Sequence, residues 1–363
     1  MMKKDTPQHG LGWDKAHQRY TAPGLIDLQV NGVDAVDFND PVLMEADVLK
    51  ATRYLLSQGV TSFFPTLITG ADDHIISLLQ TLRRACDTYP LVRACVAGIH
   101  LEGPFISAED GARGAHDVRY VKAPDWSLLE RFQEVAQGTI RLVTLAPEWE
   151  GAPELIKKCR EHDVLVSMGH SLANTAQISQ AAEAGLLLST HLGNGIPLML
   201  KRHPNMLWDQ LADDRLYAMI ITDGLHTPDA FIRVVMRVKA EKTILVSDAT
   251  RFAGMAPGEY DTVIGGKIIL DTDKRISLKG SGGLLAGAAK SLLEDVNTLV
   301  SHGLASLEEA WTMASDHVTD LFARYLPECV PAGEDRVVVR KQGDLLVVEQ
   351  VTKNGQVVYA QPA

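Results

Sequence analysis

Short, nearly continuous apolar runs alternate along most of the chain with longer stretches whose apolar residues recur at helical spacing. Eight runs have the length of strands, at residues 25–30, 60–68, 95–101, 140–145, 164–168, 186–190, 216–222 and 243–247. Amphipathic stretches between them include residues 45–57, 74–86, 173–184 and 228–240. Apolar strands separated by helices are typical of a parallel sheet that is buried on both faces. Eight of them in order predict a (β/α)8 TIM barrel over residues 23–334.

Two regions depart from this alternation. Residues 258–283 have the pattern of a β-hairpin inserted after the eighth strand. Residues 335–360 alternate apolar and polar positions around Lys353-Asn354-Gly355, and an Asn-Gly pair between such runs is a hairpin signal. We therefore expect residues 1–22 and 335–363 to form a small β appendage beside the barrel.

Composition and charge exclude several classes of protein. A hydrophobic fraction of 46% over 363 residues is ample for a large core, which argues against disorder. The net charge of −11 argues against a general binder of nucleic acid or anionic membranes, because both need a basic surface. This net charge is compatible with an anionic small-molecule ligand, since such a ligand needs only a few cationic side chains near it.

The cysteines and the apolar segments bear on location. Cys86, Cys95, Cys159 and Cys329 form no CxxC pair, which favours reduced thiols in a cytoplasmic protein. The N-terminal segment MMKKDTPQHGLGWDK lacks the apolar region of a signal peptide. No apolar run approaches the roughly eighteen residues of a membrane-spanning helix. These patterns predict a cytoplasmic location.

Polar side chains recur where the apolar strands end. They are Gln29, Asn31, Glu102, His170, His191, His226 and Asp248. In a (β/α)8 barrel the carboxyl ends of all strands meet on one face, where the active sites of such barrels lie. The positions therefore predict one shared site.

Glu102, His170 and His191 form a candidate metal site. Two imidazoles and one carboxylate are a common ligand set for catalytic zinc, with one coordination position left for water. The bound ion lowers the pKa of that water and makes a nucleophile available near neutral pH. The alternative is that each histidine only caps its strand and forms local hydrogen bonds.

Three further residues are candidates for chemistry or binding. Asp248 follows a very apolar strand and is suited to act as general acid and base, or else to cap the turn that follows. His226 is a candidate to orient substrate or polarise a carbonyl, although Asp223 offers a purely structural explanation for the DGLH segment. His116 lies in the Gly-rich loop after the third strand, where a substrate contact is expected.

The same residues carry a resemblance to a known family. The matching segments are PGLIDLQVNG (23–32), GVTSFFPTLIT (59–69), HLEGPF (100–105), GAH (114–116), GHS (169–171), THLGN (190–194), DGLH (223–226), SDAT (247–250) and LAG (285–287). In this order they resemble the N-acetylglucosamine-6-phosphate deacetylases of the amidohydrolase superfamily. The resemblance implies a barrel enzyme with one divalent ion, most simply Zn²⁺, with Fe²⁺, Mn²⁺ and Co²⁺ as alternatives, and a homodimer.

The resemblance also implies roles for single residues. Glu102, His170 and His191 would bind the metal, and Asp248 would be the acid and base. Contacts to the sugar would come from His226 and His116, and from a loop that contains Asn194, Gly195 and Arg202, with Arg202 on the phosphate. Many amidohydrolases open with His-x-His and hold two ions, whereas this chain has Gln-Val-Asn at 29–31, as in single-metal members.

The chain departs from the family pattern mainly in the loop after the second histidine. The family has HLFNAM or HLYNAM followed by Arg-Glu-Pro-Gly, whereas this chain has HLGNGIPLMLKRHPN (191–205). The expected function is removal of the N-acetyl group from an amino-sugar phosphate, with N-acetylglucosamine 6-phosphate favoured. The alternatives are an amidohydrolase for a different N-acylated sugar or small amide, such as a dipeptide or a cyclic amide, and an inactive sugar-binding relative.

Overall fold

In the computed structural model of the protein, residues 11–14, 19–262, 266–279, 285, 287–331 and 333–362 are described. The central strands are β3 (Leu25–Val30), β6 (Val60–Ile68), β7 (Ile99–Glu102), β8 (Ile140–Leu145), β9 (Leu165–Met168), β10 (Leu188–Ser189), β11 (Tyr217–Ile220) and β12 (Thr243–Leu245). They form a parallel sheet in the order β12-β11-β10-β9-β8-β7-β6-β3. Just beyond β12, Ala249 pairs in parallel with Val30 and accepts a hydrogen bond from the amide of Asn31 at 2.8 Å. This contact closes the sheet into the predicted barrel.

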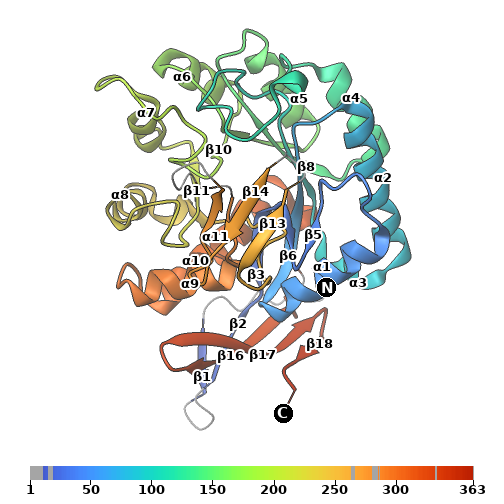
Figure 1. Cartoon of the computed structure of the whole chain (residues 1–363). Helices are drawn as coiled ribbons and strands as arrows, with labels where there is room; N and C mark the ends of the chain where they lie inside the picture. The colour runs from blue at the N-terminus through green and yellow to red at the C-terminus, as the bar shows by residue number, and fades with distance from the viewer. Residues whose placement is uncertain are drawn as a thin grey trace, which may run out of the picture.

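Helices cover the outside of this barrel (Figure 1). They are α1 (Glu45–Ser57), α2 (Asp72–Thr88), α3 (Pro90–Cys95), α4 (Trp126–Ala136), α5 (Ala152–Glu161), α6 (Thr175–Ala184), α7 (Met206–Ala212), α8 (Asp229–Lys239), α9 (Leu292–Ser301), α10 (Leu307–Met313) and α11 (Asp316–Tyr325). In α1 the buried residues are Val48, Ala51, Thr52, Leu55 and Leu56, a helical stripe that faces the strands.

The third predicted strand, 95–101, starts earlier in the sequence than the observed strand β7. The apolar run 95–101 was expected to be a strand throughout, but Cys95 is the last residue of α3 and β7 begins only at Ile99. A short apolar run does not distinguish a buried helix end from a buried strand, because both bury the same side chains. Pro90 at the start of α3 is the local signal for this helix, since its fixed backbone angle suits the first turn.

Polar side chains form a layer inside the barrel, below the carboxyl ends of the strands. His100 Nε2 lies 2.7 Å from Thr144 Oγ1, which lies 2.7 Å from Thr190 Oγ1. Thr190 in turn donates to Ser167 Oγ at 2.6 Å. Burial lowers the pKa of His100 to about 4, so this ring is neutral at physiological pH. The layer gives the strand ends above it a rigid, hydrogen-bonded floor.

The two ends of the chain form the predicted β appendage. The strands β1 (Gly12–Asp14), β2 (Arg19–Pro23), β16 (Arg336–Gln342), β17 (Leu345–Lys353) and β18 (Gln356–Ala360) pair in the order β1-β2-β16-β17-β18. Asn354 and Gly355 have φ angles of 51° and 76°, as a two-residue type I′ hairpin requires. The buried Lys353 ammonium binds Asp335 at 2.7 Å and Ser62 of β6 at 3.3 Å, which ties the appendage to the barrel.

The insertion after the last barrel strand is a three-stranded sheet, so the predicted hairpin is wrong in its number of strands. It contains β13 (Gly258–Asp261), β14 (Lys267–Leu270) and β15 (Ile276–Leu278), all antiparallel. A second turn at 271–275 adds the third strand, and residues 263–265 and 280–283 of the predicted segment lie outside the described residues. Within the part of the chain that is described, no helix is long and apolar enough to cross a membrane.

Candidate active site

The strand ends that carry the candidate residues have an unusual backbone. His170, His191 and Asp248 have φ angles of 50°, 29° and 48°. Residues other than glycine rarely adopt this left-handed region, which costs about 1–3 kcal/mol at each position and is concentrated at functional sites. The chain turns at these points, and all three side chains are found together at the mouth of the barrel with Glu102, the last residue of β7.

Glu102, His170 and His191 meet at one point. Glu102 Oε1 lies 3.1 Å from Nε2 of each histidine, and the two Nε2 atoms lie 3.1 Å apart. Donors held at about 2.0–2.2 Å from a tetrahedral zinc ion are separated by distances of this size. All three side chains are buried. The geometry of the donors fits one divalent ion.

The hydrogen bonding of His170 supports the same interpretation. Its Nδ1 lies 2.9 Å from the carbonyl oxygen of Ala112 and therefore donates to it. In a neutral ring this leaves a lone pair on Nε2, which faces the carboxylate of Glu102. Histidines that ligate metals are commonly oriented by such a hydrogen bond from the other ring nitrogen. His191 Nδ1 has no comparable partner among the described residues.

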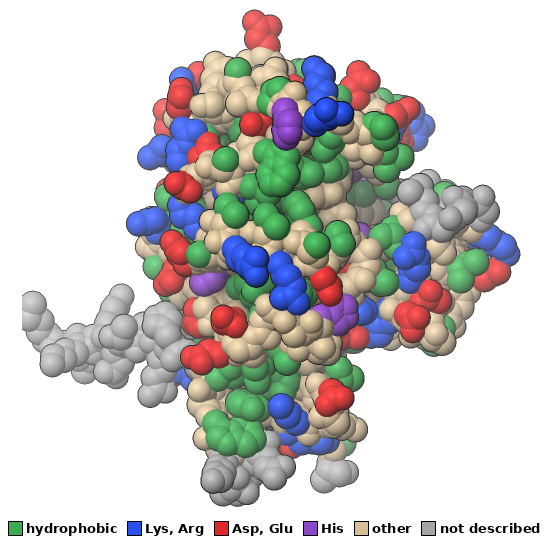
Figure 2. All heavy atoms as spheres, turned by 90° about the vertical axis from the view of Figure 1, so that its left-hand side faces the viewer, with side chains coloured by type: hydrophobic (Ala, Val, Ile, Leu, Met, Phe, Trp, Pro, Cys, Tyr) green, Lys and Arg blue, Asp and Glu red, His purple; other side chains and the backbone are tan. Residues whose placement is uncertain are grey.

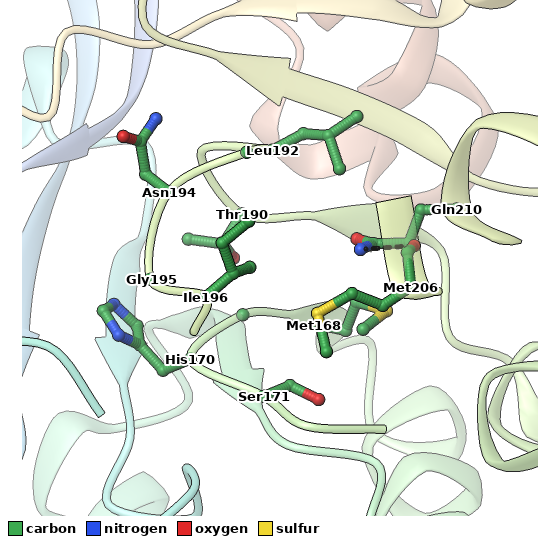
Figure 3. Close-up of a pocket in the computed structure, with 12 residues that line it drawn as sticks. Met168, His170, Ser171, Thr190, Leu192, Asn194, Gly195, Ile196, Met206 and Gln210 are labelled. Atoms are coloured by element: carbon green, nitrogen blue, oxygen red, sulfur yellow. Dashed lines mark hydrogen bonds between the residues drawn. The ribbon is translucent and has the colours of Figure 1, made fainter. Parts of the chain in front are cut away.

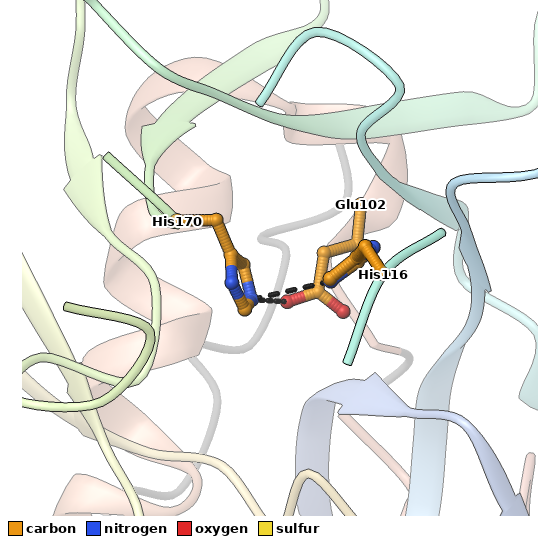
Figure 4. A group of neighbouring side chains, drawn as sticks. All are labelled: Glu102, His116 and His170. Atoms are coloured by element: carbon orange, nitrogen blue, oxygen red, sulfur yellow. Dashed lines mark hydrogen bonds and ion pairs between the residues drawn. The ribbon is translucent and has the colours of Figure 1, made fainter. Parts of the chain in front are cut away.

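His116 lies beside this cluster. Its Nε2 is 3.3 Å from His170 Nε2, and its Nδ1 is 3.0 Å from Thr69 Oγ1. The ligand atoms of Glu102, His116 and His170 lie within 4.8 Å of one another, so these residues are a second candidate set (Figure 4). The set with His191 is tighter, because each of its three atoms lies 3.1 Å from the other two.

Two side-chain amides at the end of β3 form hydrogen bonds with the carboxylates of the site. Gln29 Nε2 donates to Glu102 Oε1 at 3.0 Å, and Asn31 Nδ2 donates to Asp248 Oδ1 at 2.7 Å. The sequence marked both positions as strand-end amides in place of a His-x-His pair but did not reveal their partners, which lie 73 and 217 residues away. Their neutral amides thus orient the acidic groups without adding charge.

The two carboxylates differ in acidity. Burial opposes ionisation of Glu102, but the hydrogen bonds with His170 and His191 outweigh it and hold its pKa well below the usual range. Burial, followed by the nearby charge of Glu102, raises the pKa of Asp248 to about 6. A carboxylate with a pKa near the working pH is suited to take up and return a proton.

Asp223 and His226 form a pair after β11. Asp223 accepts from the backbone amides of Leu225 and His226 at 2.8 and 2.9 Å, and its other oxygen lies 2.7 Å from His226 Nδ1. The structural and the functional interpretation of the DGLH segment are therefore compatible, because the carboxylate of Asp223 both builds the turn and orients the imidazole of His226. His226 Nε2 is left as the nitrogen available to a ligand.

A cavity of about 730 Å³ opens above these residues. Its lining includes Glu102, His116, His170, His191, Asn194, Gly195, His226 and Asp248. Arg202 does not line it and is exposed, together with Lys201 and His203. A much smaller hollow of about 10 Å³ lies behind His170, between Thr190, Met206 and Gln210, and has room for about one water (Figure 3). The larger cavity has the size of a small-molecule site.

The loop that departs from the family pattern projects apolar side chains. Leu198 and Met199 are 91% and 88% exposed, and Leu198 also lines the cavity. Trp208 of α7 and Val238 of α8 are 55% and 49% exposed. Hydrophobic side chains gather on this side of the molecule among scattered charges (Figure 2). Of these side chains, Leu198 is the one that lies at the mouth of the cavity.

Gly195 lies directly against the histidines of the cluster. It has a φ of 60°, and a Cβ atom there would lie 2.8 Å from His170 Nδ1 and 3.1 Å from His191 Cε1. Real Cβ atoms do not approach other atoms at 2.8 Å, so one of the rings would have to move. The absence of a side chain at this loop residue thus leaves the space that the two imidazoles occupy.

We expect Gly195→Ala to weaken metal binding by at least about tenfold, since residues that orient metal ligands commonly contribute that much. Chelator competition on the folded protein measures this change. Gly138→Ala is the matched control, because Gly138 has a φ of 76° and open space around its Cβ. Equal metal affinity of the two variants would show that contact with the rings has no effect.

Comparisons with known proteins agree with this site. No family model matches the chain. The chain is 31% identical over 329 residues to the N-acetylglucosamine-6-phosphate deacetylase of Bacillus subtilis (strain 168). The alignment covers 90% of this chain and 80% of the relative. The chain belongs to the N-acetylglucosamine-6-phosphate deacetylase family.

Two further deacetylases are also similar to this chain. The N-acetylgalactosamine-6-phosphate deacetylase of Escherichia coli O157:H7 is 31% identical over 337 residues, with 92% of this chain and 86% of the relative covered. A mutant Mycobacterium smegmatis deacetylase, solved in complex with N-acetyl-D-glucosamine-6-phosphate, superimposes with a TM-score of 0.81 at 26% identity. That match covers 93% of this chain and 86% of the other. Relatives of this chain are thus named for two epimers of the sugar.

Proposed function

We propose that the protein hydrolyses the acetamide of N-acetylglucosamine 6-phosphate to glucosamine 6-phosphate and acetate. The observation that carries this proposal is the convergence of Glu102, His170 and His191 at 3.1 Å in the wall of a cavity that also presents Asp248. These three side chains would hold one divalent ion, with zinc favoured by the two imidazoles. When bound, the ion polarises the acetyl carbonyl and lowers the pKa of a water molecule.

Asp248 is proposed to move the proton. Its carboxylate takes a proton from the attacking water and then delivers it to the leaving amine, so that the C–N bond breaks to give a neutral amine. The hydrogen bond from Asn31 fixes one oxygen of the carboxylate, which leaves the other for the reaction. A catalytically inactive sugar-binding protein would not need this acidic group at the cavity.

The remaining candidates are proposed to position the substrate. Asp223 accepts from Nδ1 of His226, and its carboxylate would favour a ring that also carries a proton on Nε2; that N–H is proposed to donate to the acetyl oxygen as negative charge develops there. His116 and Asn194 line the cavity on the side of the cluster and are proposed to contact the sugar, with the backbone of Gly195. The assignment of Arg202 to the phosphate rests on the resemblance alone, because its side chain lies outside the cavity.

The proposal also covers the location of the protein, its assembly and the roles of its two parts. The four cysteines are free thiols in the structure, which supports a reducing cytoplasmic location. A homodimer is proposed from the family resemblance. The proposed role of the barrel, residues 23–334, is catalysis, and that of the β appendage is to cover one end of it.

The test is acetate release from N-acetylglucosamine 6-phosphate, N-acetylgalactosamine 6-phosphate and unphosphorylated N-acetylglucosamine, on protein of known metal content. We expect the first substrate to have the highest kcat/KM. A higher value for the galactosamine epimer would change the sugar but keep the reaction. Full metal content with no acetate released from any of the three would contradict the proposal.

The acidity of Asp248 gives a pH prediction. Because its pKa is raised to about 6, the group is increasingly protonated as the pH falls through that value and can no longer accept a proton from water. We therefore expect kcat/KM to fall on the acid side, with a midpoint no higher than about 6, since a bound cation would lower the pKa. A pH profile from 4.5 to 9, on protein whose metal content is checked at each pH, measures it. A loss of activity with a midpoint well above 6 would contradict this assignment.

A further inference from the structure

Arg251 is the cationic residue of the cavity. Among the described residues that line it, Arg251 is the single arginine or lysine. The same lining contains the carboxylates Asp37, Glu102 and Asp248. A substrate with a phosphate group would be repelled by these charges unless a cation inside the cavity received it. The lining therefore singles out one side chain for that role.

The guanidinium of Arg251 has unused hydrogen-bonding capacity. Its Nε is buried and has no hydrogen-bond partner. In the described part of the chain no hydrogen bond joins it to a carboxylate, although its charge offsets part of the rise that burial causes in the pKa of Asp37, which accepts from the amide of Asn39 at 2.9 Å. A buried donor of this kind costs free energy unless an acceptor is supplied. A phosphate oxygen is an acceptor that matches the planar guanidinium.

The backbone that carries Arg251 is fixed next to the reacting groups. Arg251 follows Asp248 by three residues, and its carbonyl accepts from the amide of Ala35 at 2.8 Å. The preceding Thr250 donates through its amide to Ala288 at 2.9 Å. The centre of the guanidinium lies 6.0 Å from the ring centroid of Phe252, a further contact that limits its movement. An anion bound here would lie in the same cavity as the proposed metal site.

We propose that Arg251 binds the phosphate monoester of the substrate and sets the preference for a phosphorylated sugar. This inference rests on the proposed function, because it assumes a phosphorylated amino sugar. It assigns the anion to a residue inside the cavity of the same chain, whereas Arg202 lies on an exposed loop. The sequence signal was present, since Arg251 follows the last barrel strand, but a lone arginine next to SDAT does not reveal which cavity it faces.

The kinetic test compares Arg251→Gln and Arg251→Lys with wild type. Arg251→Gln is expected to raise KM for N-acetylglucosamine 6-phosphate by at least about tenfold, with a smaller change in kcat, because a charge-assisted pair is lost. It is expected to leave kcat/KM for unphosphorylated N-acetylglucosamine near the wild-type value, and Arg251→Lys is expected to recover part of the loss. Arg237→Gln, an exposed residue in the last turn of α8, is the control for loss of one charge.

A binding measurement separates this inference from the proposed reaction. Calorimetry with glucosamine 6-phosphate and with glucosamine needs no turnover, and Arg251→Gln is expected to weaken only the first by at least about tenfold. If wild type released no acetate but showed this difference, the reaction would be wrong and the anion site would stand. If Arg251→Gln bound glucosamine 6-phosphate as wild type does, or if Arg202→Ala alone removed the preference, Arg251 would not be the anchor.

Discussion

Replacing His170 with alanine is expected to remove most of the tightly bound metal and, with it, hydrolysis of the acetylated sugar. The reason is the ligand count, since two protein donors hold a divalent ion far less well than three. His191→Ala is expected to have the same effect, because its Nε2 lies as close to Glu102 Oε1 as that of His170. Elemental analysis of the dialysed variants measures the loss, with circular dichroism to confirm that the barrel is folded.

The matched variant for this prediction is His116→Ala. His116 also faces the cluster, and the alternative ligand set would include it in place of His191. We expect His116→Ala to keep close to one ion per chain while its kinetics change. Metal loss from His116→Ala with retention in His191→Ala would show that His116, and not His191, is the third ligand. Two tightly bound ions in wild type would show that Gln29 and Asn31 do not prevent a second metal site.

Asp248→Asn is expected to reduce kcat by at least about 10²-fold, the usual scale of general acid and base catalysis. The amide has nearly the same shape but cannot accept the proton of water, so the fold and most of the metal are expected to remain. Substrate affinity should change little, because the loss concerns the chemical step. Rapid mixing of enzyme and substrate, together with steady-state assays, separates kcat from binding.

The chain offers a control for this substitution. Asp163 is an exposed aspartate with a φ of 55°, so Asp163→Asn makes the same change on the same kind of backbone outside the barrel mouth. We expect it to leave kcat at the wild-type value. If Asp248→Asn also turned over at a rate near that of wild type, the proton would be moved by another group, and His226 would be the next candidate.

Much of the barrel could be predicted from the sequence because its local signals agree with one another. The strands β3, β6 and β8 and the helix α1 occupy the predicted residues, since each is an uninterrupted apolar run or an amphipathic stretch between turn residues. The predicted secondary structure was wrong where burial alone does not distinguish a helix from a strand. Cys95 is buried at the end of α3 although the run that contains it was expected to be a strand.

The positions of the site were also predictable, but its contacts were not. Strand ends meet in a barrel, so Glu102, His170, His191 and Asp248 could be grouped before their distances were known. The left-handed backbone at three of these residues leaves no trace in composition or spacing. The hydrogen bonds of Gln29 and Asn31, the carbonyl that orients His170 and the unpartnered Nε of Arg251 all depend on tertiary contacts.

The most direct test of the central claim is a metal titration of chelator-treated enzyme, with acetate release from N-acetylglucosamine 6-phosphate as the readout. The three donors at 3.1 Å predict almost no activity without metal and a linear rise with added Zn²⁺ that ends near one ion per chain. Full activity in the metal-free protein, or a rise that continues to two ions per chain, would contradict a single-metal hydrolase.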